Sequence, residues 1–187
     1  MARFIVQQCN SHKYNNMKEI YLAGGCFWGT EHLFKQIDGV IDTATGFANG
    51  HPDAPQEPTY EEVYTDQTGY AETVRIRYDE TRVGLRFLLK IFFMSIDPTS
   101  LNQQGHDVGT RYRTGIYYTD PEDLHVINDI MAAQQSLHSL PLAVEVEPLR
   151  LFFPADDYHQ DYLDKNPNGY CHLPLELFRM VRDMKPE

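Results

Sequence analysis

Three cysteines are the first candidates for chemistry in this chain of 187 residues, at Cys9, Cys26 and Cys171. None belongs to a C-x-x-C pair, and the eight histidines form neither an i, i+4 pair nor an H-E-x-x-H motif. We therefore expect no structural zinc site and no catalytic metal. The glycine-rich patterns that bind nucleotide phosphates are also missing. A reactive thiol is the chemistry to consider first.

Cys26 follows Gly24-Gly25, where a predicted strand at 19–23 gives way to a predicted helix. The unpaired amide hydrogens of a helix start lower the pKa of a thiol, and the glycines keep bulk away from the sulfur. The alternative is a buried cysteine that packs as a small apolar residue. The position of Cys26 makes it a candidate nucleophile but does not decide between these two roles.

Two further features could complete a site around Cys26. Phe27 and Trp28 follow it directly and either line an apolar pocket or belong to the core. Glu72 lies on the apolar face of a strand predicted at 70–78. A carboxyl group buried there has a raised pKa and can donate a proton near neutral pH. The alternatives are a wrong strand register or an edge position where the carboxylate reaches water.

The predicted strands and helices alternate imperfectly, which favours the α+β class. We expect a flexible extension at 1–17 and one domain at 18–187, with a mixed β-sheet packed with helices in a two-layer sandwich, a ferredoxin-like core and an irregular C-terminal tail. Strands are predicted at 19–23, 40–47, 70–78, 115–119 and 143–151, and helices at 27–37, 60–66, 81–96, 122–138 and, capped by Asp156 or Asp157, 158–165. Apolar spacing after residue 174 also allows a short helix in the tail.

The net charge and the hydropathy of the chain limit the kinds of partner that we expect it to bind. The chain has 16 Lys and Arg against 27 Asp and Glu, a net charge of −11, so nucleic acid and anionic membranes would mostly repel it. No stretch approaches the roughly 20 apolar residues that span a bilayer, and the first residues lack a secretory signal. We expect a cytoplasmic monomer, with Met17 as a second candidate start.

Longer motifs then occur in a consistent order along the chain. They are GCFWG at 25–29, PTYEEV at 58–63, TGYAETVRIRYD at 68–79, DPT at 97–99, QGHDVGTRYR at 104–113 and PADDYHQDYLDKNPNGYC at 154–171. Together they resemble the type A peptide methionine sulfoxide reductases over about residues 18–172. The resemblance implies reduction of the S epimer of methionine sulfoxide, either free or within oxidised proteins.

The resemblance also implies roles for residues that local patterns leave undecided. Cys26 would attack the sulfoxide sulfur and become a sulfenic acid, while Glu72, Tyr60 and Tyr112 donate hydrogen bonds or a proton to the oxygen. Asp107 would help to organise this site.

Phe27 and Trp28 correspond to the residues that hold the substrate methyl group in the family. Cys171 corresponds to the resolving cysteine, which would form a disulfide with Cys26. The family takes its reducing electrons from thioredoxin and needs no bound cofactor. Cys9 lies outside the resemblance.

Three positions depart from the family pattern beside these motifs. Tyr70 stands where relatives usually have histidine, His106 where they usually have asparagine, and Arg111 where they usually have glutamine. The local hydrogen bonds and the pH optimum of the site are the properties that these departures put in question.

Two rival hypotheses remain. Cys26 paired with a histidine could form a cysteine hydrolase or acyltransferase, although the sequence does not indicate which histidine would reach it. A non-catalytic module could instead bind oxidised methionine or sense oxidants through Cys26. Following both sulfoxide epimers in the presence of a dithiol would separate these hypotheses from the reductase.

Overall fold

A computed structural model describes residues 16–186 of the chain. Cys9 lies outside the described residues, and so does most of the extension predicted at 1–17. The strands are β1 (Met17–Gly24), β2 (Val40–Ala48), β3 (Ala71–Asp79), β4 (Gln103–Gln104), β5 (Asp107–Val108), β6 (Thr114–Tyr118), β7 (Glu145–Pro148) and β8 (Phe152–Pro154). The helices are α1 (Phe27–Phe34), α2 (Tyr60–Tyr64), α3 (Leu85–Ser95), α4 (Leu124–Gln135), α5 (Tyr162–Lys165) and α6 (Leu175–Asp183).

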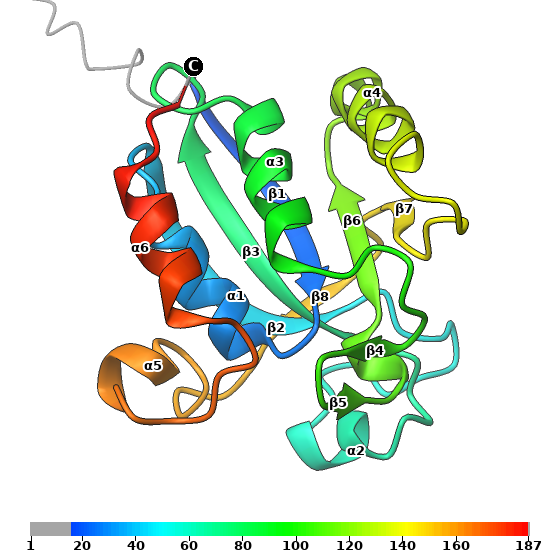
Figure 1. The fold of residues 1–187 in the computed structure, drawn as a ribbon. Helices are drawn as coiled ribbons and strands as arrows, with labels where there is room; N and C mark the ends of the chain where they lie inside the picture. Colours follow the sequence, from blue (N-terminus) through cyan, green and yellow to red (C-terminus); the bar gives the residue numbers. More distant parts are fainter. Residues whose placement is uncertain (1–15, 187) are drawn as a thin grey trace, which may run out of the picture.

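The main sheet has six strands in the order β7-β6-β1-β3-β2-β8. Every neighbouring pair is antiparallel except β6 and β7, so the expected α+β class with a mixed sheet is confirmed. The narrower expectation of a ferredoxin-like two-layer core stays a prediction. Strands β4 and β5 form a separate two-stranded ribbon beside the site (Figure 1).

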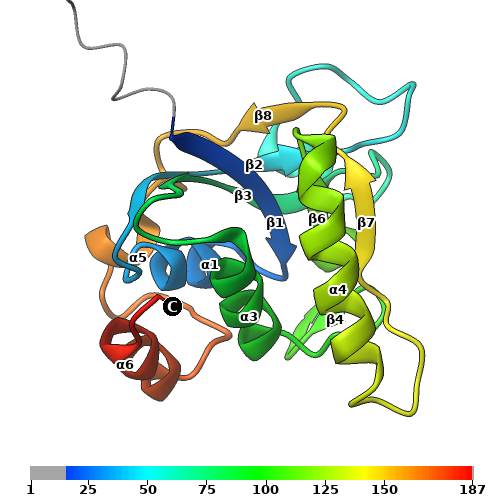
Figure 2. The same cartoon turned by 90° about the horizontal axis from the view of Figure 1, so that it is seen from above.

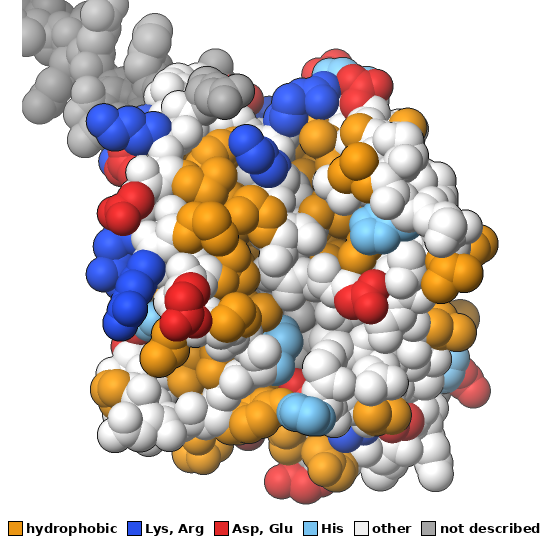
Figure 3. Space-filling view, viewed as in Figure 1, with side chains coloured by type: hydrophobic (Ala, Val, Ile, Leu, Met, Phe, Trp, Pro, Cys, Tyr) orange, Lys and Arg blue, Asp and Glu red, His pale blue; other side chains and the backbone are white. Residues whose placement is uncertain are grey.

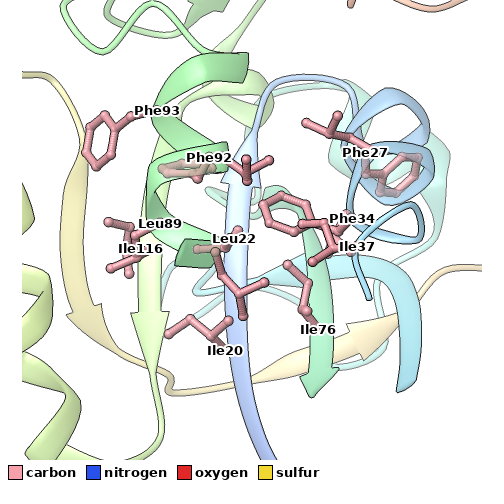
Figure 4. Packing of buried hydrophobic residues seen from close by; sticks show 14 of the residues in the cluster. Ile20, Leu22, Phe27, Phe34, Ile37, Ile76, Leu89, Phe92, Phe93 and Ile116 are labelled. Carbon is pink, nitrogen blue, oxygen red and sulfur yellow. The ribbon is translucent and has the colours of Figure 1, made fainter. Parts of the chain in front are cut away.

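Helices α1 and α3 cover one face of the main sheet, as the two ribbon views show (Figures 1 and 2). Their apolar faces meet the inward side chains of β1, β3 and β6 in the main core, where Ile20, Leu22 and Ile76 are fully buried against Phe34 and Phe92 (Figure 4). Burying such side chains stabilises the fold by about 1.5–3 kcal/mol each. This core holds the start of α1 rigidly over the end of β1.

The expected strand at 143–151 is wrong in its bounds, because only β7 forms within it, and a separate strand, β8, begins after it at Phe152. These strands are joined by Leu149, Arg150 and Leu151, yet they pair with β6 and β2 at opposite edges of the sheet. The sheet is curled, and Asn49 at the end of β2 bonds to the connection: its Oδ1 accepts from the Arg150 amide at 2.8 Å. The residues of one continuous strand would all pair with the same neighbouring strand, which β7 and β8 do not do.

Two further boundaries differ from the prediction. The helix expected at 158–165 is only α5, because Asp161 has a left-handed φ of 54° and starts the helix without a side-chain cap. The C-terminal tail is not wholly irregular, because α6 forms and buries Leu177, Phe178 and Val181. Hydrophobic side chains also gather on the surface over α6 and α3 (Figure 3).

Within residues 16–186, no helix has the length and apolarity that crossing a bilayer requires.

Candidate active site

Cys26 lies at the N-cap of α1, between the end of β1 and the helix. Gly25 makes the turn with a φ of +83°, which favours glycine. A Cβ on Gly25 would also lie 2.7 Å from Cβ of Gln104, so no side chain fits there. The predicted turn is confirmed, and it leaves Cys26 only 5% exposed.

The electrostatics of Cys26 differ from the prediction. Burial raises the pKa of the thiol well above its ordinary value, and the negative charge that Glu72 can carry raises it further. The backbone amide of Trp28 lowers the pKa but does not offset the burial. The expected lowering by the helix start is therefore wrong for the resting site, and Cys26 is held there as a neutral thiol.

Glu72 lies on β3 with its carboxyl group inside the protein, 1% exposed. Its Oε2 accepts a hydrogen bond from the Phe27 amide at 3.0 Å, which ties it to the first turn of α1. Burial raises the pKa of Glu72 to about 8, against the lowering effects of the Phe27 amide and Arg111. The carboxyl group is neutral at pH 7, as the strand pattern predicted.

Two phenols approach the same region from different segments. Tyr60 is the first residue of α2, which begins with a capping box between Thr59 and Glu62. Tyr112 ends a 3-10 turn at 110–112 and is 8% exposed. Burial and the charge of Glu72 raise the pKa of both phenols, to about 12 for Tyr112. Both are therefore hydrogen-bond donors at neutral pH.

Aromatic side chains enclose one side of the site. The Trp28 ring stacks on Tyr162 with a centroid distance of 3.7 Å, and its Nε1 donates to Nδ1 of His159 at 3.2 Å. Phe27 lies 6.4 Å from Trp28 between ring centroids. Local sequence patterns do not predict a site role for Tyr162 and His159, although both belong to the PADDYHQDY motif. Phe27 is 1% exposed and belongs to the main core, whereas Trp28 is partly exposed, so Trp28 is the ring of this pair that can face a small substituent.

Asp107 lies on β5, after a turn in which Gly105 has a φ of +58°. Its Oδ1 accepts a hydrogen bond from the Tyr170 hydroxyl at 2.8 Å. Its Oδ2 is buried and has no hydrogen-bond partner. Asp107 is thus tied to the segment that carries Cys171, and one of its oxygens remains available.

Cys171 is half-buried, and both Cys171 and Cys26 are free thiols in this structure. Its Sγ lies over α1 at Gly29, where an added Cβ would be only 3.0 Å from the sulfur. Gly29, whose role no local sequence pattern predicts, therefore leaves room for Cys171. The negative charge that the Cys171 thiol can carry also raises the pKa of Cys26.

The three departures from the family pattern have different surroundings. Arg111 is 7% exposed, pairs with Asp66 at 2.8 Å and lies 4.0 Å over the Tyr64 ring. It also lowers the pKa of Glu72, so it acts on the site directly. Tyr70 is buried and donates to the carbonyl oxygen of Pro55, whereas His106 is exposed.

One group of described residues could hold a metal ion, although none was expected. It consists of Cys26, Asp107 and His172, whose donor atoms lie within 4.8 Å of one another. Because the three residues come from distant segments, no local spacing in the sequence indicates them. In the same cluster a ring nitrogen of His172 lies within 4.8 Å of the Cys26 sulfur. His172 is therefore the histidine that could act as the base of a cysteine hydrolase.

Comparison with known proteins gives the same answer at the level of sequence and of fold. The description of the family Peptide methionine sulfoxide reductase matches residues 18–185. A peptide methionine sulfoxide reductase MsrA from Clostridium acetobutylicum is 53% identical over 163 residues, which cover 87% of this chain and 99% of that protein. Reduced Mxr1 from Saccharomyces cerevisiae has a similar structure, with a TM-score of 0.79, 37% identity and coverage of 92% of this chain and 93% of that one. Mxr1 in complex with Trx2 aligns less closely, with a TM-score of 0.55, 28% identity and coverage of 79% and 85%.

The fold and the site are therefore those of an oxidoreductase. The chain belongs to the peptide methionine sulfoxide reductase family, and it is a reductase of methionine sulfoxide.

Proposed function

We propose that this protein reduces the S epimer of methionine sulfoxide, in oxidised proteins or as the free amino acid, with Cys26 as the nucleophile. The observation that carries the proposal is the neutral carboxyl group of Glu72, buried on β3 and bonded to the residue after Cys26. An ionised carboxylate could not donate to the sulfoxide oxygen. The resemblance of the whole chain to type A reductases supports the choice of epimer.

In the first step, the sulfur of Cys26 attacks the sulfoxide sulfur while the oxygen receives a proton from the site. Glu72, Tyr60 and Tyr112 are the donors around it, and each is neutral at pH 7. The oxygen passes to Cys26, the S–O bond of the substrate breaks, and methionine leaves. A thiol and a sulfoxide thus give a sulfenic acid and a sulfide, with no net gain or loss of protons.

Phe27 and Trp28 would hold the methyl group of the substrate against the aromatic wall. Asp107 would organise the polar side of the site through its bond to Tyr170. The wall is rigid because Trp28 is both stacked on Tyr162 and hydrogen-bonded to His159. Aromatic rings beside the reacting sulfur favour a small apolar substituent.

In the second step, the thiol of Cys171 attacks the sulfenic acid of Cys26, a disulfide forms and water leaves. The position of Cys171 over Gly29 supports this role. Thioredoxin would then reduce the disulfide by dithiol exchange, so that no bound cofactor is needed. The Mxr1 structure with Trx2 supports thioredoxin as the partner.

We also infer that 18–187 is a single domain with a ferredoxin-like core. The inference is supported by the central order β6-β1-β3-β2, which is antiparallel throughout, and by the position of α1 and α3 on one face. A monomeric state, a cytoplasmic location and a lack of nucleic-acid or membrane binding stay predictions from sequence.

The deciding experiment incubates the protein with racemic methionine sulfoxide and a dithiol and follows each epimer. We expect loss of the S epimer only, no first turnover in Cys26→Ser, and one stoichiometric turnover without thioredoxin-supported cycling in Cys171→Ser. Consumption of neither epimer would reject the proposal. Loss of the single turnover in Cys171→Ser would reject a purely resolving role for this thiol.

The hydrolase hypothesis gains one observation, because the donor atoms of His172 and Cys26 lie within 4.8 Å. Hydrolysis of thiol-sensitive esters is therefore measured in the same samples. Ester turnover that matches or exceeds sulfoxide reduction would favour the hydrolase.

A further inference from the structure

Three donor groups of different chemistry converge beside the start of α1. The thiol of Cys26, a carboxylate oxygen of Asp107 on β5 and a ring nitrogen of His172 lie within 4.8 Å of one another. The three residues reach this point from separate segments: Cys26 from the turn after β1, Asp107 from the β4–β5 ribbon, and His172 from the chain that leads to α6. Sulfur, nitrogen and oxygen donors of this kind are the usual protein ligands of Zn²⁺.

Three nitrogen and oxygen atoms of Asp107 and His172 have no hydrogen-bond partner within the described residues. Both ring nitrogens of His172 are buried without a hydrogen-bond partner, and so is Oδ2 of Asp107. The other oxygen of Asp107 is already occupied by the Tyr170 hydroxyl. Buried polar atoms without partners are rare and costly, so each calls for a physical explanation. A ligand placed between the three side chains would satisfy one ring nitrogen of His172 together with a carboxylate oxygen of Asp107.

We propose that Cys26, Asp107 and His172 form a Zn²⁺ site in the reduced protein. Three atoms no more than 4.8 Å apart leave a point within about 2.8 Å of each, and Zn²⁺ bonds of about 2.0–2.3 Å need only small side-chain movements from there. The thiolate and the carboxylate balance the two positive charges of the ion. Three protein ligands leave one tetrahedral position open for water or for the neighbouring Cys171 sulfur.

Occupation of this site would block reduction of the sulfoxide. Binding replaces the proton of the Cys26 thiol with Zn²⁺ and releases that proton to solvent. The sulfur that is proposed to attack the substrate is then held by the metal. Formation of a Cys26–Cys171 disulfide would remove the sulfur ligand and release the ion. Only this inhibitory consequence rests on the proposed function, because binding itself does not require that Cys26 be catalytic.

The test uses the full chain, reduced and freed of reductant, with Co²⁺ as a spectroscopic probe of the Zn²⁺ site. We expect one equivalent of Co²⁺ to give a thiolate-to-cobalt absorption band in the near ultraviolet, and one equivalent of Zn²⁺ to remove it. Cys26→Ser should abolish the band. His172→Gln and Asp107→Asn should each weaken binding at least about tenfold.

Matched controls separate this site from incidental binding. Cys9→Ser removes a thiol that is not one of the three proposed ligands, and His125→Gln changes an exposed histidine on α4, so both variants should bind Co²⁺ as the unchanged protein does. No thiolate band, or a band of equal affinity in both His172→Gln and Asp107→Asn, would overturn the proposal. Loss of the band in Cys9→Ser would also overturn it.

Inhibition is measured separately, by adding Zn²⁺ and then a chelator during sulfoxide reduction. We expect reversible inhibition with the affinity found by Co²⁺ displacement, and at least about tenfold weaker inhibition in His172→Gln. If the protein binds Zn²⁺ but does not reduce the sulfoxide, the proposed function is rejected and the proposed metal site is still supported. Full activity of the metal-loaded protein would reject the inhibitory role.

Discussion

Two buried glutamates, Glu72 on β3 and Glu31 on α1, have similar electrostatics and very different surroundings. Glu31 is 2% exposed and Glu72 is 1% exposed. Burial is the largest cause of the raised pKa in each, to about 7 for Glu31 and about 8 for Glu72. The two carboxyl groups cannot be told apart by their burial or by the direction of their pKa.

Their hydrogen bonds separate them. Both oxygens of Glu31 hold other segments, because Oε1 accepts from the Thr43 hydroxyl at 3.2 Å and Oε2 accepts from the Asp161 amide at 2.8 Å. Glu72 has one bond of this kind, from the Phe27 amide. Glu31 therefore fastens β2 and the chain before α5 to α1, whereas Glu72 keeps capacity to donate beside Cys26.

The comparison shows that a raised carboxyl pKa identifies a candidate acid only when a donor position remains free near a reacting atom. Four experiments test the distinction between Glu72 as a proton donor and Glu31 as a structural carboxyl group, in order of decreasing expected effect.

Glu72→Gln is expected to lower the rate of single-turnover sulfoxide reduction by about 100-fold, with a smaller effect on substrate binding, because the amide cannot transfer a proton. Glu31→Gln, the matched control, should change the rate less than about threefold. Rapid-quench measurement of methionine release at saturating substrate tests both variants. Equal rate losses in the two would remove the distinction between the carboxyl groups.

Both substitutions should alter the pH dependence of stability. A carboxyl group whose pKa is raised by folding binds its proton more tightly in the folded state, so the free energy of unfolding falls as pH rises from about 4.5 to about 7 for Glu31, or to about 8 for Glu72. The loss is on the order of 3 kcal/mol for Glu31 and on the order of 5 kcal/mol for Glu72, and substitution by Gln removes it. Urea unfolding at several pH values measures how the free energy of unfolding depends on pH in each variant and in the unchanged protein. The same pH dependence in all three proteins would contradict the prediction.

The pH dependence of the reaction should separate the glutamates again. Above about pH 8, Glu72 loses its proton, and the single-turnover rate of the unchanged protein should fall by up to roughly tenfold per pH unit. Glu31→Gln should keep this alkaline decline, and Glu72→Gln should lose it. A decline that persists in Glu72→Gln would assign the proton donor to another group.

The smallest expected effect comes from Thr43→Val, which removes the hydroxyl that donates to Glu31. We expect a loss of about 1 kcal/mol in the free energy of unfolding at pH 8, where Glu31 is ionised, and unchanged reduction of the sulfoxide. Urea unfolding and a steady-state assay measure the two quantities. A slower reaction with unchanged stability would link Glu31 to catalysis.

The sequence predicted Glu72 but not Glu31, for a physical reason. A strand alternates strictly between two faces, so a carboxyl group among apolar neighbours on β3 is conspicuous. Glu31 lies on a short helix, where charged residues usually face water. Its partners at Thr43 and Asp161 are 12 and 130 residues away, and no local pattern contains them.

The same limit explains the rest of the fold and the site. The turn before Cys26 and the amphipathic α3 follow from local spacing, so they could be predicted closely. The end of β7 at Pro148 and the start of β8 at Phe152 depend on pairing with β6 and β2, which local sequence patterns do not record. The cluster with His172 likewise arises only when three separate segments meet.

The two strands at the edges of the curled sheet both end in proline, at Pro148 and Pro154. Proline has no amide hydrogen to offer a further strand, and each edge strand has only three or four residues. A further strand would therefore find few amide hydrogens along β7 and β8, the two strands at the ends of the sheet order.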